Sequence, residues 1–282
     1  MNRITASALI GAGALLAAVL PATASAADTA PVYHVTQEGV SADQGARLAA
    51  AFNIPNALDK TGAFSFAGPS FGQVPLRRVA VGKDEAGRPT VSQAIDTKAL
   101  AAIRPLPDND ALDRANKLLD IAQVSPELRP IPSVSHTKLT LADKLGRKLS
   151  DTPLDTAVSF RFELGGLPVS GQGAKLRATF AGDGSVTQLS DTLRGLQRGA
   201  DVAVIPADKA LAACQKLYGP LVRQGAPTLG YVLPPLGQVK DIYPSYTCNP
   251  SAARGTQAHR QIPAVAGVAP KAVIKASRVG QA

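Results

Sequence analysis

Apolar and polar residues along this chain follow two patterns, a helical period of three to four residues and the alternation typical of strands. The first helical stretch begins at Ser41 with Gln44 three residues later, which is the pattern of a capping box. Leu48 and Phe52 then fall, with Ala49, on one face of the predicted helix. Alternating stretches follow and predict strands over residues 63–67, 74–81 and 89–95.

A second helix is predicted to begin near Asp108 or Asp110, because carboxylates favour the N-terminal end of a helix. Its apolar residues recur at the helical period, at Leu112, Ala115, Leu118, Leu119 and Ala122. The proline-containing stretch 126–132 then predicts a linker between this helix and the next sheet.

The clearest strand pattern lies in the middle of the chain. Over residues 158–164, apolar residues alternate with polar ones, which predicts a strand with one buried and one solvated face. The glycine pair 165–166 predicts the turn that follows. The same alternation recurs over 176–180, and the glycine-rich turn 182–184 leads into a return strand at 186–189.

A third helix is predicted with Pro206 at its first position. Its apolar face carries Ala207, Ala210, Leu211, Cys214 and Leu217, so Cys214 is expected on the buried side. Strands are expected at 229–233 and 239–246. Beyond Cys248 we expect a loosely held tail, with residues 262–265 and 272–274 as candidate edge strands.

Three segments of the chain share one order, a helix followed by short strands and glycine-rich turns, which indicates a weak internal repeat. The predicted fold class is therefore α+β, with helices packed on antiparallel sheets. A signal peptide, an N-terminal unit, two repeat units and a basic tail are predicted over residues 1–26, 27–105, 106–200, 201–248 and 249–282.

The N-terminal residues have the features of a secretory signal peptide. Arg3 precedes the apolar run 6–20, and Ala24 and Ala26 form the small-residue site after which cleavage would leave Ala27 first. An uncleaved membrane anchor is the alternative, but the run is shorter than the roughly 20 residues that a spanning helix needs. We therefore expect a secreted protein without a transmembrane segment.

Cys214 and Cys248 are the only cysteines in the chain. In the oxidising compartment that export implies, two thiols generally pair, so we expect a disulfide between them. A metal site or a catalytic thiol is the alternative, and either would need histidine or carboxylate companions that the surrounding sequence lacks.

The formal net charge is +9, and the last acidic residue of the chain is Asp241. The candidate residues for binding a polyanion are the basic side chains of the tail, Arg254, Arg260, Lys271, Lys275 and Arg278. The chain has no tryptophan and few other aromatic residues, so it lacks the interleaved aromatics that stack on bases. An acidic cell-wall polymer is therefore a candidate partner, whereas nucleic acid is not.

No short motif predicts a catalytic residue. The segment Gly68–Gly72 has the spacing of a nucleophile elbow around Ser70, but no helical pattern follows it, as that elbow requires. His34, His136 and His259 lie far apart in the sequence and form no zinc-binding motif. A Ser-His-Asp triad assembled only in space stays open.

Motifs for metals and cofactors are missing as well. The aspartates at 108, 110, 113 and 120 lack the central glycine and the terminal glutamate of a calcium loop. The glycines at 171 and 173 lie between predicted strands rather than before a helix, so dinucleotide binding has no support. We expect no metal and no cofactor.

Residues 164–189 resemble a known family. Leu164–Val169, Gly173–Leu176 and Asp183–Val186 are similar to the strand start and hairpin of PepSY and fungalysin/thermolysin-propeptide units. More broadly, the chain resembles secreted actinobacterial proteins of unknown function with such repeats. The resemblance implies tandem cystatin-like units, in which a sheet wraps a helix, and a role in folding and inhibiting a protease.

These observations lead to a first hypothesis, a secreted binding or regulatory module without catalytic activity. No protease domain follows residue 248 in this sequence, so inhibition or chaperoning of a secreted peptidase is expected to act in trans, through a peptide strand added to a sheet edge. The alternative is a structural envelope protein held to acidic wall polymers by its basic tail. An unrecognised hydrolase is the third hypothesis.

Overall fold

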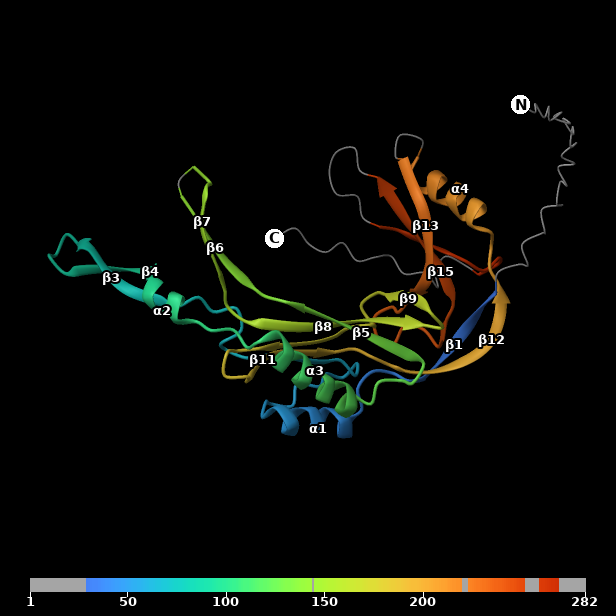
Figure 1. The fold of residues 1–282 in the computed structure, drawn as a ribbon, viewed down its shortest axis with the longest axis horizontal. Helices are drawn as coiled ribbons and strands as arrows, with labels where there is room; N and C mark the ends of the chain where they lie inside the picture. The colour runs from blue at the N-terminus through green and yellow to red at the C-terminus, as the bar shows by residue number, and fades with distance from the viewer. Residues whose placement is uncertain (1–28, 144, 220–222, 252–258, 269–282) are drawn as a thin grey trace, which may run out of the picture.

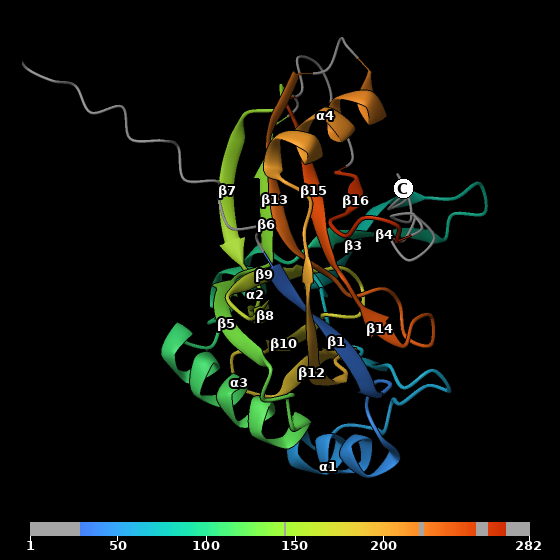
Figure 2. The same cartoon turned by 90° about the vertical axis from the view of Figure 1, so that its right-hand side faces the viewer.

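The computed structural model describes residues 29–143, 145–219, 223–251 and 259–268. Within these residues the chain is an α+β structure of four helices and mainly antiparallel sheets. Figures 1 and 2 show two helices together below the central strands and a third at the opposite end of the molecule. The helices are α1 (Ala42–Phe52), α2 (Thr97–Ala102), α3 (Asp108–Ala122) and α4 (Ala207–Tyr218).

The largest sheet has nine strands. Eight follow in the order β16-β15-β13-β9-β8-β10-β11-β2, and β5 pairs with β8. All these pairs are antiparallel except that of β13 with β9. The strands are β2 (Phe64–Ala67), β5 (Leu128–Ser135), β8 (Thr156–Leu164), β9 (Leu167–Ser170), β10 (Leu176–Phe180), β11 (Val186–Asp191), β13 (Arg223–Val232), β15 (Pro244–Ser251) and β16 (Gln261–Pro263).

Three smaller sheets complete the described structure. One has the order β12-β1-β14 and consists of β12 (Gly195–Ala203), β1 (Thr29–Gln37) and β14 (Asp241–Ile242). The other two are separate hairpins, β3 (Leu76–Lys83) with β4 (Pro89–Ile95), and β6 (Lys138–Ala142) with β7 (Lys148–Pro153). Figure 1 shows both hairpins projecting from the body of the molecule.

The nine-stranded sheet takes strands from all three predicted units. Strand β2 of the N-terminal unit pairs with β11, and β13 of the last unit pairs with β9. Similarly, β1 pairs with both β12 and β14. The sheets therefore extend across the predicted boundaries at residues 105 and 200, and neighbouring units share strands.

The main hydrophobic core lies between α1, α3 and the central strands. Leu48 of α1 and Leu118 of α3 have no exposed surface, and the apolar residues of β8 are all buried. The Gln44 side-chain amide donates to the carbonyl oxygen of Ala122 at 3.2 Å, which joins α1 to the end of α3. The predicted capping box at Ser41 is confirmed, because its side chain and that of Gln44 each accept from the other's backbone N–H.

The stretch 126–132 was predicted to be a linker, and this prediction is wrong. Most of it belongs to β5, which pairs with β8 along its whole length. Pro130 and Pro132 lie opposite Phe162 and Phe160. The backbone nitrogens of both prolines, which carry no hydrogen, face away from β8. An edge strand tolerates proline in this orientation, and the sequence pattern did not reveal it.

The helix predicted to begin near Asp108 or Asp110 begins at Asp108, with both aspartates in its first turn, which confirms this prediction. Pro107 precedes it without a side-chain cap, and the carboxylate of Asp108 lies 3.1 Å from Nε2 of His136. Two details of α4 differ from the sequence prediction. Pro206 occupies the N-cap position of α4 rather than its first turn. Leu217 was placed on the buried face of this helix but is 39% exposed.

The tail beyond Cys248 is more structured than predicted. Gln261–Pro263 forms β16 and pairs with β15, which overlaps the first half of the segment 262–265 that was a candidate edge strand. Ala264 has no exposed surface, and its carbonyl oxygen accepts from the N–H of Ile205 at 2.7 Å. The second candidate, 272–274, lies outside the described residues, as does the predicted signal peptide.

Candidate functional site

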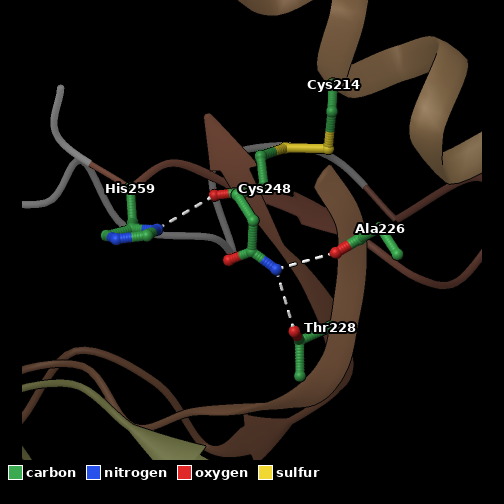
Figure 3. The surroundings of a disulfide bond; sticks show 6 residues. Cys214, Ala226, Thr228, Cys248 and His259 are labelled. Atoms are coloured by element: carbon green, nitrogen blue, oxygen red, sulfur yellow. Dashed lines mark hydrogen bonds between the residues drawn. A yellow bond between two sulfur atoms is a disulfide. The ribbon is translucent and has the colours of Figure 1, made fainter. Parts of the chain in front are cut away.

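The predicted disulfide is confirmed and lies next to an uncovered strand edge of the nine-stranded sheet. Cys214 of α4 and Cys248 of β15 are joined across a separation of 34 residues (Figure 3). Both cysteines are buried, and no free cysteine occurs in the described chain. By constraining the unfolded chain, a loop of this length stabilises a fold by roughly 3–4 kcal/mol.

The disulfide fixes α4 over a pair of antiparallel strands. β13 pairs with β15 from Arg223 to Tyr231, with one register shift before Thr228. At this bulge the side-chain amide of Asn249 donates to the carbonyl oxygen of Ala226 at 2.7 Å and to Thr228 Oγ1 at 3.0 Å (Figure 3). These bonds hold the irregular part of β13 in one conformation.

One edge of β13 is uncovered over most of its length. Among the described strands, β9 is the only partner on that side, and it pairs only with Tyr231 and Val232. The part of β13 from Arg223 to Leu229 therefore has a hydrogen-bonded strand on one side alone, while the backbone of Pro168 in β9 lies beside Gly230. An edge of this kind presents backbone N–H and C=O groups to an incoming strand.

The prolines of β15 show which groups of β13 point outward. Pro244 and Pro250 lie opposite Tyr231 and Gln224 and have no N–H to donate. The Cys248 N–H donates to the carbonyl oxygen of Arg260, on the β16 side, which fixes the direction of the even-numbered residues of β15. By this alternation, the backbone groups of Gln224 and Leu229 point away from β15, toward the uncovered edge.

The other long edges of the nine-stranded sheet are blocked. The outward edge of β5 lacks N–H groups at its two prolines. Beside β2, the Ser65 N–H donates to the carbonyl oxygen of Ala57, and Leu58 forms a bridge to Phe64. Within the described sheet, β13 therefore offers a longer uncovered edge than β2, and its outward N–H groups at Gln224 and Leu229 lie on either side of a bulge that contains Pro227.

The three histidines occupy separate places. His34 Nδ1 lies 2.6 Å from Asp241 Oδ1 in an exposed pair, His136 Nδ1 lies 2.9 Å from the carbonyl oxygen of Asp155, and His259 Nδ1 lies 3.2 Å from that of Cys248. No serine hydroxyl bonds to any of them within the described residues. Ser70 lies in the turn 69–72 before β3, not between a strand and a helix.

Acidic side chains do not gather into a metal site in the part of the chain that the structure describes. The predicted cluster of aspartates is spread along the exposed side of α3, and only Asp108 of the group takes part in an ion pair. No described helix is both long and apolar enough to cross a bilayer.

Two buried ionisable residues were not found from the sequence. Burial raises the pKa of the Asp191 carboxyl to about 7, although the Leu193 N–H that donates to it at 2.8 Å opposes the shift. The Arg194 guanidinium is fully buried, and its Nη2 donates to the carbonyl oxygens of Pro234 and Pro235 at 2.8 and 2.9 Å. Burial lowers the pKa of Arg194, and Glu38, 3.1 Å from its Nε, opposes this shift.

Arg260 is the one predicted polyanion-binding residue within the described structure. Its guanidinium carbon lies 5.4 Å from the ring centroid of Tyr218, at the end of α4. Arg254, Lys271, Lys275 and Arg278 lie outside the described residues, and so do Ala26 and Ala27 at the predicted cleavage site.

The free edge of β13 was not predicted from the sequence. The only sequence signal for it is the pair Pro244 and Pro250 on β15, which lack N–H groups.

Comparison with protein-family models, with curated proteins and with solved structures finds no match to this chain. The likeness of residues 164–189 to PepSY units therefore stays a prediction. The established properties are an α+β fold, a disulfide between α4 and β15, and an uncovered edge on β13.

Proposed function

We propose that this chain is a secreted, non-enzymatic binding module that receives an extended peptide strand at the free edge of β13. The observation that supports this proposal is the uncovered edge from Arg223 to Leu229, beside a disulfide-linked helix. The disulfide and the predicted signal peptide both agree with an oxidising, extracellular location. In this proposal the chain consists of PepSY-like units, and the strand belongs to a secreted peptidase that it inhibits or helps to fold.

The physical basis is strand addition to a rigid edge. Main-chain hydrogen bonds supply affinity in this binding mode, and in this proposal they form to the backbone groups of Gln224 and Leu229, which point away from β15. The neighbouring disulfide and the Asn249 bonds order β13 before a partner arrives. Binding therefore costs less conformational entropy than it would at a mobile loop.

The test uses the mature chain from Ala27 and thermolysin as the probe peptidase. We expect saturable inhibition, together with slower deuterium exchange at the amides of Gln224 and Leu229 in the complex. Gln224→Pro removes the outward N–H but no bond to β15, so inhibition should weaken by about tenfold, the equivalent of one lost hydrogen bond of roughly 1.4 kcal/mol.

Gln224→Ala is the matched control, because it keeps the backbone N–H and should inhibit as the parent does. Thermal unfolding of both variants checks that the strand is intact. Failure of the chain to bind either thermolysin or a library of extended peptides would contradict the proposal. Hydrolysis of a substrate by the chain itself would replace it with the enzyme hypothesis.

A further inference from the structure

The two projecting hairpins end in the same turn. Asp84 begins one turn and Asp143 the other, and each carboxylate accepts from Nε of the arginine four residues later, at 2.7 Å from Arg88 and 2.6 Å from Arg147. The glycine before each arginine has a positive φ, 79° and 77°. Both turns are therefore built by their own local bonds and need no support from the body of the protein.

Exposed apolar side chains are concentrated on these hairpins. In the described chain, five of the six large apolar residues with high exposure lie there, and they are 54% to 78% exposed. They are Leu76, Val81 and Val91 on β3 and β4, with Leu145 and Leu149 at the turn and on β7. Such grouping on projecting elements marks an interaction surface.

The charge that remains uncompensated on the hairpins is positive. Their aspartates are already paired, Asp84 and Asp143 with the turn arginines and Asp151 with Lys148. Glu85 is the remaining acidic residue of the two hairpins. The cations that have no ion pair with another described residue are Arg77, Arg78, Lys83 and Lys138. The complementary partner is therefore anionic.

A flat surface can reach both hairpins at once. In Figure 1 the rest of the described ribbon lies on one side of the line that joins the two hairpin ends. A plane seen edge-on along this line would touch both hairpins without crossing the body. A second copy of the chain would instead bring like charges together, which disfavours self-association at this surface.

We propose that the two hairpins dock together on the surface of an anionic lipid bilayer. Val81, Val91, Leu145 and Leu149 enter the interfacial region, while the hairpin arginines and lysines bind headgroup phosphates. Buried apolar area and attraction to anionic lipid add in this mode, and two weak attachments on one molecule reinforce each other. The hairpin surface is separate from the β13 edge, so the two proposals can fail independently.

The test is co-sedimentation of the mature chain, with its disulfide intact, with vesicles of phosphatidylcholine alone or mixed with phosphatidylglycerol. We expect binding to the mixed vesicles only, with loss at high salt. Leu145→Ser with Leu149→Ser, Val81→Ser with Val91→Ser, and Arg77→Gln with Arg78→Gln should each weaken binding at least about tenfold.

Matched controls come from exposed residues outside the hairpins. Leu217→Ser removes the sixth exposed apolar side chain, on α4, and Arg47→Gln with Lys117→Gln removes two exposed cations from α1 and α3. Both should bind as the parent does, and thermal unfolding checks every variant. Equal loss in the controls, equal binding to neutral vesicles, or hairpin-dependent dimers in ultracentrifugation would each overturn the proposal.

Discussion

At the scale of single residues, the buried polar side chains have the clearest physical consequences. Asp191 is 1% exposed and forms no ion pair with a cation of the described chain, so its burial is not offset by a charge partner. Arg194 is equally buried but has Glu38 and two carbonyl oxygens as partners. The same degree of burial therefore makes one group pH-sensitive and the other a fixed link between segments.

Asp191 is expected to make the protein less stable as the pH rises. Its folded pKa of about 7 exceeds the ordinary value of 3.8, so the folded state holds the proton more tightly. The free energy of unfolding should therefore fall between about pH 4 and pH 7, by roughly 2–4 kcal/mol. Asp191→Asn should flatten this dependence in urea unfolding at pH 5 and pH 8, while the exposed Asp113→Asn should leave it unchanged.

At the scale of elements, the edges of the sheet decide what the fold can bind. β5 and β13 both expose an edge, but the prolines of β5 remove outward donors while those of β15 face away from the edge of β13. Proline thus removes donors from the β5 edge, whereas on the β13 edge Gln224 and Leu229 keep their outward N–H groups on either side of Pro227. The local sequence of β13 alone does not show this difference.

Replacing the two prolines of β5 should create a second adhesive edge. Pro130→Thr with Pro132→Thr restores two outward N–H groups, so we expect concentration-dependent dimers by edge pairing. Sedimentation velocity over a range of concentrations measures this. Ser133→Thr on the same strand is the control, and a variant that stays monomeric throughout would show that the prolines do not protect this edge.

At the scale of the whole molecule, segments far apart in sequence complete each other. β1, near the N-terminus of the described chain, pairs with β12 and β14, and β16, near its end, covers part of β15. Tyr231 links the two regions, because its hydroxyl donates to the carbonyl oxygen of Pro31 at 2.7 Å. The segment 259–268 is therefore part of the fold, and only the residues beyond it are candidates for an independent basic tail.

Two truncations separate these parts of the C-terminal region. A chain ending at Val268 keeps every contact between the described residues, so it should unfold at the temperature of the full chain but leave washed cell walls at lower salt. The full chain should be released near 0.5 M salt, where the Debye length falls to roughly 4 Å.

A chain ending at Ser251 loses β16 and the buried Ala264, and it should unfold at a lower temperature. Equal wall retention of the full chain and the chain ending at Val268 would contradict the wall-polymer hypothesis. Equal unfolding temperatures for both truncations would show that β16 adds nothing to stability.

The sequence by itself determined the features that depend on neighbouring residues. The capping box of α1, the alternation in β8, the glycine turns and the pairing of the only two cysteines all follow from local spacing or from counting. Strand partners were decided only by the tertiary structure. The prolines of β5 predicted a linker, but in the structure they lie opposite Phe160 and Phe162 of β8 as part of a strand. The free edge of β13 and the burial of Asp191 belong to this second group, since both depend on which distant segments fold against them.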